Sequence, residues 1–186
     1  MRLVDRDPVR IRLTGRGGQG IMLGGAILAE AAMRDGLLVS ETQEYGPEAR
    51  LGATKADLII STREIAYPEV EKADLILCLS RAAYLRYAQS LAEGGLLIAD
   101  SSMAEEMGEA ESTVYLPFRT TALELGNELT TNIIGLGALV AISEVVTRFS
   151  LAAAVAGRVK PEFAELNNQA LEVGFNLAAS VQARQA

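Results

Sequence analysis

The glycine-rich stretch Thr14-Gly15-Arg16-Gly17-Gly18-Gln19-Gly20 holds the residues whose types and spacing could bind a ligand. Four glycines within six positions remove the Cβ atoms that would keep the backbone away from a ligand or a neighbouring chain. The helix expected after Gly20 would present free N–H groups and its positive dipole end to this turn. Arg16 carries a guanidinium that can pair with phosphate. The stretch therefore predicts a turn that can bind an anion.

The spacing Gly15-x-Gly17-x-x-Gly20 also matches the dinucleotide-binding fingerprint, with a strand before it and a helix after it. Glu41 follows Gly20 by twenty-one residues, at the expected end of the second strand, where a carboxylate could bind a ribose hydroxyl. An alternative interpretation is that the glycines allow tight packing and that Glu41 is an ordinary strand-end carboxylate. A P-loop is excluded, because Ile21 follows Gly20 and no Gly-Lys-Ser/Thr sequence appears.

Two features disagree with a plain dinucleotide site. Gln19 places a side chain that donates and accepts hydrogen bonds beside the extra glycine at the tip of the turn. The second strand also leads into a loop with one aromatic, one acidic and one basic side chain. These features favour recognition of a structured partner, or of a ligand held between two chains. We predict no catalytic residue and no metal ligand; the predicted binding residues are Gly15, Arg16, Gly17, Gly18, Gln19, Gly20, Tyr45, Glu48 and Arg50.

Apolar runs, helix caps and turn residues indicate the elements that must position these side chains. The alternation of strands with helices predicts an α/β fold of three layers: a mostly parallel, Rossmann-like sheet with helices on both faces and a helical C-terminal portion. The glycine turn, Glu41 and the loop after it would meet at the carboxyl ends of the strands. We expect strands over 9–13, 37–41, 54–61, 75–79, 95–100 and 113–116, and helices over 21–34, 82–92, 132–146 and from 161 onward.

The last helix carries an apolar stripe at steps of three and four residues, which usually packs within the same chain and less often binds a partner. A connection of small residues is expected before this helix, from residue 147 to 160. Cys78 lies between Leu77 and Leu79 in a buried strand, so we expect an inert core thiol. The stripe consists of Phe163, Leu166, Ala170, Val173, Leu177 and Val181.

Composition excludes several classes of function. The chain of 186 residues has no histidine and one cysteine, so it cannot build an imidazole site, a disulfide framework or an iron–sulfur cluster of its own. The cysteine usage fits the cytoplasm, and the net charge of −7 argues against nucleic acid as a partner. We expect one domain over 1–186, with a tail over 1–8, no signal peptide and no membrane span, since the longest apolar run, 133–142, is too short.

The N-terminal segment runs against the acidic balance of the chain. Two interpretations stay open for its arginines: a solvated tail, or positive potential near the glycine turn. The arginines are Arg2, Arg6, Arg10, Arg12 and Arg16.

The glycine motif followed by Tyr45-Gly46-Pro47-Glu48-Ala49-Arg50 resembles the gamma subunit of 2-oxoacid:ferredoxin oxidoreductases, which act on pyruvate, 2-oxoglutarate or branched-chain oxoacids. Further matches are Ile59-Ile60-Ser61, Tyr67-Pro68, Ala73-Asp74 and the run Asn132-Ile133-Ile134-Gly135-Leu136-Gly137-Ala138. The resemblance covers about residues 9 to 180. It implies a subunit of a complex that oxidatively decarboxylates a 2-oxoacid to an acyl-coenzyme A and passes electrons to ferredoxin.

The resemblance also implies partners and cofactors. Alpha and beta subunits, and in some complexes a delta subunit, would hold thiamine diphosphate and iron–sulfur clusters, while this chain would hold no cofactor alone and would not be catalytic alone. The chain would complete the complex and shape the entrance to the active site. The helix N-terminus with Arg16 and Arg50, both able to reach phosphate, adds the hypothesis that the glycine turn helps to hold coenzyme A. Two other readings remain: a free-standing oxidoreductase that binds NAD(P) or FAD, and a purely structural assembly subunit. The apolar C-terminus makes a homodimer of the isolated chain a further expectation.

Overall fold

A computed structural model describes residues 6–44, 52–108 and 112–185. The strands are β1 (Val9–Arg16), β2 (Leu38–Glu44), β3 (Ala53–Ser61), β4 (Ala73–Cys78), β5 (Leu91–Asp100) and β6 (Thr113–Leu116). The α-helices are α1 (Ile21–Arg34), α2 (Arg81–Tyr87), α3 (Ala104–Met107), α4 (Phe118–Glu124), α5 (Thr131–Ser143), α6 (Arg148–Arg158) and α7 (Ala164–Gln185). Short 3₁₀ turns are η2 (Ala88–Ser90), η3 (Ser101–Met103), η4 (Glu128–Thr130) and η5 (Pro161–Phe163).

The strands form one sheet in the order β2-β3-β1-β4-β5-β6. β1, β4, β5 and β6 pair in parallel, which confirms the mostly parallel sheet. β3 pairs antiparallel with both β1 and β2, so β2 runs in the same direction as β1 without touching it. The expected βαβ unit is therefore split by an inserted strand. The reason is that β2 continues into β3 as an antiparallel neighbour, which needs no crossover helix.

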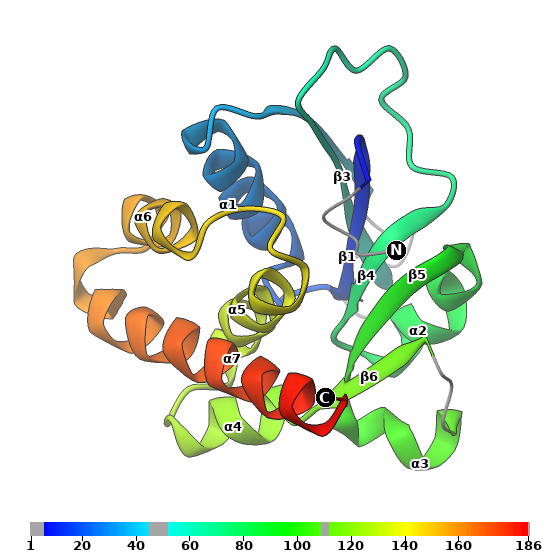
Figure 1. Cartoon of the computed structure of the whole chain (residues 1–186). Coiled ribbons are helices and arrows are strands. Elements are labelled where there is room, and N and C mark those ends of the chain that lie inside the picture. The colour runs from blue at the N-terminus through cyan, green and yellow to red at the C-terminus, as the bar shows by residue number, and fades with distance from the viewer. Residues whose placement is uncertain (1–5, 45–51, 109–111, 186) are drawn as a thin grey trace.

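Helices cover both faces of the sheet, as predicted, but unequally. Figure 1 shows α1, α5, α6 and α7 gathered on one side of the sheet and α2 on the other. The larger core lies on the α1 side, where Ile27 and Leu28 of α1 and Leu136 of α5 are fully or almost fully buried. A smaller core lies under α2, around Tyr87 and Ile76. The helix over residues 21–34 is confirmed, and α6 covers its outer side.

Glycines set the closest contact between helices, where α5 crosses α7. A Cβ atom on Gly174 would lie 2.3 Å from the carbonyl oxygen of Ile134, and one on Gly137 would lie 2.7 Å from that of Leu171. This contact fixes which side of α7 faces inward. The buried stripe is Asn167, Ala170, Leu171, Gly174, Phe175 and Ala178.

The predicted stripe is therefore only partly right. Ala170 belongs to the buried stripe, Leu166, Val173 and Leu177 lie half-buried along its border, and Phe163 is exposed. The side chain of Val181 lies outside the described part of the chain. The buried stripe still contains the large apolar residues Leu171 and Phe175, but it is rotated from the predicted one. It is centred on Gly174, because only a glycine there lets the backbones of α5 and α7 approach.

The largest errors in the expected boundaries concern two helices. Residues 148–158 form helix α6 instead of a connection, because Thr147 caps the helix by accepting from Ser150 N and an alanine-rich run propagates it. The second expected helix stops early, since α2 ends at Tyr87 and β5 begins at Leu91. Gly94, with φ of 65°, lies inside β5 at a register shift and not at a helix end.

In the described part of the chain, no helix combines the length and the apolar character that a membrane span requires.

Candidate functional site

The glycine stretch forms a tight turn between β1 and α1 at the carboxyl edge of the sheet. The amide of Gln19 donates to the carbonyl of Arg16 at 3.2 Å, which closes the turn. Gly18 and Gly20 have φ of 91° and 70°, a region that L-residues enter only with strain. Gly20 is the N-cap of α1 and contributes no side-chain hydrogen bond, so the first N–H groups of the helix have no side-chain cap.

The side chain of Gln19 points into the fold and not outward. Its Oε1 accepts from the backbone N–H of Arg16 at 2.8 Å, and its Nε2 donates to the carbonyl of Leu79 at 3.0 Å. Gly15 leaves room for it, because a Cβ there would lie 2.8 Å from the same Oε1. Both hydrogen-bonding ends of the amide are thus used within the chain, where sequence reasoning expected them to face a partner or ligand.

This placement matters because Leu79 follows β4. α1 leaves β1 toward one face of the sheet, whereas α2 follows β4 on the other, so the chain changes face between these two strands. Such a switch point opens the crevice in which many α/β folds bind ligands. Here the Gln19 amide bridges β1 and β4 across that point.

Asn132 fastens the turn to the first turn of α5. Its Nδ2 donates to the carbonyl of Gly20 at 3.1 Å, and its Oδ1 accepts from the N–H of Ile133 at 2.9 Å. The side chain is buried, and a Cβ on Gly20 would lie 2.4 Å from its Nδ2. Sequence reasoning identified Asn132 only within a family motif and missed this role, because the two residues are far apart in the sequence.

Open space lies on the α5 side of the turn, in two adjoining hollows. The first, here called the turn cleft, has a volume of about 410 Å³; residues 16–19 form one side, and Glu128, Leu129 and Thr131 form the other. The second, the apolar groove, has a volume of about 370 Å³ and lies between α1, η4, η5 and the start of α7. Gly18 and Leu129 line both hollows and therefore form the border between them.

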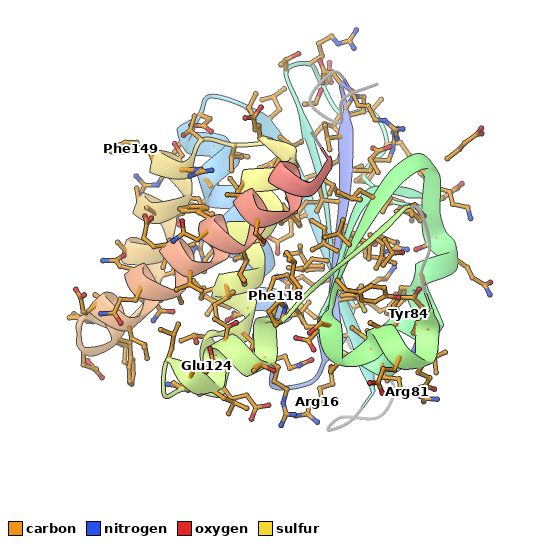
Figure 2. The ribbon with its side chains drawn as sticks, turned by 60° about the horizontal axis from the view of Figure 1, so that its bottom comes forward. Arg16, Arg81, Tyr84, Phe118, Glu124 and Phe149 are labelled. Atoms are coloured by element: carbon orange, nitrogen blue, oxygen red, sulfur yellow. The ribbon has the colours of Figure 1, made fainter. Side chains whose placement is uncertain are left out.

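Arg16 gives the turn cleft its free positive charge. It is exposed, and its guanidinium has no hydrogen bond or ion pair with any residue that the structure describes. Glu128 is already engaged, because Arg119 Nε donates to it at 2.7 Å. This hydrogen bond, with smaller help from Arg16, lowers the pKa of Glu128. Figure 2 shows Arg16 extending from the same edge of the molecule as Arg81 of α2.

The second group of predicted site residues follows β2. Tyr45, Glu48 and Arg50 lie outside the described residues. The strand before them is described: Glu44 pairs with Lys55, which pairs with Thr14 of β1. Glu44, the last residue of β2, therefore lies at the same edge of the sheet as the glycine turn.

Glu41 does not lie where a dinucleotide site would need it. It pairs with Leu58, opposite Ile11, so it lies halfway along the edge strand β2, three residues before the end of that strand. Its carboxylate faces α1, since a Cβ on Gly25 would lie 2.6 Å from Oε1, and it accepts from Gln43 Nε2 at 2.8 Å. β3 also separates β2 from β1. The geometry does not support a ribose-binding role for Glu41.

Cys78 is a core residue, as predicted. The thiol is buried in β4, and this burial raises its pKa to about 11. Among the described residues, no group of three His, Cys, Asp or Glu side chains could hold a metal. With one buried cysteine and no histidine, the residues of this chain do not fit an iron–sulfur cluster.

The N-terminal arginines are mostly structural. Arg12 is buried and pairs with Asp57 through two hydrogen bonds, from Nε at 2.7 Å and from one terminal nitrogen at 2.8 Å. Arg6 pairs with Asp74, which holds the described end of the expected tail against β4. Among the described arginines of this segment, Arg16 is the one that lines the turn cleft, and Arg6 and Arg12 are held in ion pairs within the fold. Arg2 lies outside the described residues. The sequence signal that could have predicted a buried Arg12 is the alternation of Arg10 and Arg12 with apolar residues in a strand.

Comparison with known proteins gives consistent matches. The profile of the family described as pyruvate ferredoxin/flavodoxin oxidoreductase matches residues 10–177. The 2-oxoglutarate synthase subunit KorC of Methanocaldococcus jannaschii is 39% identical over 173 residues, which cover 90% of this chain and 92% of that protein.

Solved structures share the fold. The gamma subunit of a keto/oxoacid ferredoxin oxidoreductase from Geobacter sulfurreducens superposes with a TM-score of 0.82 at 38% identity, covering 92% of this chain and 99% of that one. A 2-oxoglutarate:ferredoxin oxidoreductase from Magnetococcus marinus, solved with 2-oxoglutarate, coenzyme A and succinyl-CoA, superposes with a TM-score of 0.84 at 21% identity. That match covers 95% of this chain and 32% of the longer one.

Proposed function

The chain belongs to the pyruvate ferredoxin/flavodoxin oxidoreductase family, and from this premise we propose that it works as the gamma subunit of a complex that oxidatively decarboxylates a 2-oxoacid to an acyl-CoA. The electrons released by this reaction pass to ferredoxin. The chain itself supplies no histidine, and its one thiol is buried with a pKa of about 11. It acts by completing the complex.

The substrate that the relatives favour is 2-oxoglutarate. A 2-oxoglutarate synthase subunit matches this chain over nearly the full length of both proteins at 39% identity, whereas an indolepyruvate oxidoreductase subunit matches at 27%. Rates of ferredoxin reduction by the purified complex with 2-oxoglutarate, pyruvate, 2-oxoisovalerate and indolepyruvate test this assignment. We expect 2-oxoglutarate to give the highest rate, and a preference for any of the other three would refute it.

Partner subunits carry the redox chemistry in this proposal. Alpha and beta subunits, with a delta subunit in some complexes, hold thiamine diphosphate and iron–sulfur clusters in the cytoplasm. The composition of this chain supports the division, because it lacks the cysteines that a cluster needs.

Coenzyme A is the ligand that we assign to the turn cleft, and the unpaired guanidinium of Arg16 is the observation that carries the assignment. Coenzyme A is rich in phosphate, which arginine binds well. The N-terminus of α1 follows the turn directly and has no side-chain cap, and in this assignment its backbone N–H groups add donors for phosphate. Gly17 and Gly18 keep the approach to these groups free of side chains. In this assignment Gln19 and Asn132 position the turn and do not touch the ligand.

Calorimetry of coenzyme A binding to the assembled complex tests this assignment. A hydrogen bond to a charged group contributes about 1.5–3 kcal/mol, so Arg16→Ala should weaken binding by about tenfold or more. Arg81→Ala is the matched control, because Arg81 lies at the same edge but is already paired with Glu106. We expect this control to bind like the wild type. Equal affinity of the wild type and Arg16→Ala would refute the assignment.

A purely structural role is the second candidate. The observation that favours it is that Gln19 and Asn132 already bind the backbone of the turn. If Arg16→Ala leaves coenzyme A affinity unchanged while removal of the whole chain abolishes activity, the chain acts in assembly alone. Binding of NAD(H), NADP(H) or FAD to the isolated chain would instead revive the dinucleotide alternative.

A further inference from the structure

The apolar groove gathers exposed apolar side chains from three separate elements beside the turn cleft. Leu23 of α1 is 39% exposed, Leu129 of η4 is 73% exposed and Phe163 of η5 is 45% exposed. All three line the same hollow of about 370 Å³. Single exposed apolar residues are common on protein surfaces, but a concave cluster of them marks an interaction site.

The charge of the groove is one-sided. Arg158 and Lys160 line it, and its described lining includes no acidic side chain, although the chain as a whole has a net charge of −7. Arg158 is paired with Glu30 at 2.7 Å. Lys160 is 74% exposed, and its paired carboxylate, on Glu162, is 4.0 Å away. Lys160 therefore offers a positive charge that a partner can engage.

These observations favour a protein partner that carries an apolar side chain next to a carboxylate. A second copy of this chain fits poorly, because groove-to-groove packing would bring two copies of Lys160 and Arg158 together. The fold of this chain also occurs in Magnetococcus marinus as about a third of one longer polypeptide, where it is covalently joined to other parts of the enzyme. A chain that is not covalently joined to the rest of the enzyme needs an exposed docking surface to make the equivalent association.

We propose that the apolar groove is the docking site for another subunit of the oxidoreductase complex, which inserts an apolar side chain against Leu129 and places a carboxylate near Lys160. The inference rests on the proposed function. It also places the partner directly beside the turn cleft, because Leu129 and Gly18 line both hollows. A subunit that docks here would close one side of the cleft and so couple assembly to ligand binding.

The test uses the tagged chain produced together with the other subunits of its complex. Leu129→Glu puts a carboxylate where the partner's apolar side chain is proposed to insert, and Lys160→Glu reverses the charge at the rim of the groove. Leu123→Glu is the matched control, because Leu123 is 52% exposed but does not line the groove. Copurifying subunits are identified by bound thiamine diphosphate and iron–sulfur absorbance, and their affinity for the chain is measured by titration. Melting of each isolated variant confirms that it folds.

We expect Leu129→Glu to weaken association by about tenfold or more, as for a central contact residue. Lys160→Glu should weaken it less and should make it less sensitive to salt. Leu123→Glu should associate like the wild type. The inference is overturned if Leu129→Glu associates with the other subunits like the wild type. It is also overturned if the isolated wild-type chain forms a dimer that Leu129→Glu converts to monomers. Failure of the wild-type chain to copurify with any such subunit overturns the proposed function and this inference with it.

Discussion

Substitution of Gly20 by alanine tests whether Asn132 of α5 stabilises the glycine turn. Gly20 has φ of 70°, and a Cβ atom there would lie 2.4 Å from Nδ2 of Asn132. That nitrogen donates to the carbonyl of Gly20 at 3.1 Å, so the new methyl group displaces the side chain that fastens the turn. Gly36 provides the matched control at the other end of α1. Its φ is 78°, and a Cβ there would meet nothing within 4 Å.

The difference between the two variants isolates the Asn132 contact. A left-handed conformation costs an L-residue about 1–2 kcal/mol, and both variants incur this cost. Gly20→Ala additionally loses a hydrogen bond and leaves a buried amide unpaired, for about 1–2 kcal/mol more. For a chain of this size each kcal/mol lowers the melting temperature by about 2–4 °C. We therefore expect decreases of about 4 °C for Gly36→Ala and about 9 °C for Gly20→Ala.

Differential scanning calorimetry of the isolated chain measures both decreases. Asn132→Ala and the double variant Gly20→Ala/Asn132→Ala complete the cycle, because the alanine at position 20 should cost less once the Asn132 side chain is gone. Equal melting temperatures for Gly20→Ala and Gly36→Ala would refute the reasoning. They would mean that Asn132 yields without loss and does not hold the turn.

Three further predictions concern the rest of the fold. Gly174→Ala should destabilise the chain by about 3 kcal/mol or more, because its Cβ would lie 2.3 Å from the backbone carbonyl of Ile134. Gly157→Ala should stabilise the chain by about 0.5–1 kcal/mol, because the nearest atom to its Cβ would be 3.5 Å away. Changes in melting temperature of the same sign for both variants would contradict this. Hydroxyl hydrogen bonds from Thr62 and Ser61 lower the pKa of Asp7 from 3.8 to about 2, so its contribution is complete above the unfolded pKa and is lost as pH falls through the folded one. Asp7→Asn should therefore lower the urea midpoint at neutral pH and approach the wild type below pH 2, whereas an equal deficit at both would refute the assignment. The buried hydroxyl of Tyr87 has no partner among the described residues, so Tyr87→Phe should leave stability unchanged or raise it by about 1 kcal/mol; a loss of similar size in urea unfolding would reveal a partner.

The sequence predicted what local chemistry determines. The turn over 15–20 and α1 after it follow from neighbouring residues, because glycine, an apolar run and Gly36 act within a few positions of one another. The buried strands around Leu77 and Ile98 follow from continuous apolar runs in the same way. The family motifs carried the prediction of function, which spacing alone left open between a dinucleotide site and packing.

Contacts between distant segments determine the rest. The insertion of β3 between β1 and β2 moved Glu41 away from the turn, and no local signal distinguishes that order from a plain βαβ unit. Gln19 turns inward because Leu79 offers a carbonyl across the switch point. α7 buries Gly174 because Gly137 lies opposite, so the close approach of the two backbones decides which apolar residues of α7 face inward.

The most direct test of the central claim is the activity of the purified complex with and without this chain. The assay is ferredoxin reduction that depends on both 2-oxoglutarate and coenzyme A. We predict that the complex lacking the chain is inactive or nearly so, that adding the chain restores activity, and that the chain alone has none. Full coenzyme A-dependent activity without the chain, or turnover by the chain alone, would contradict its role as a non-catalytic gamma subunit.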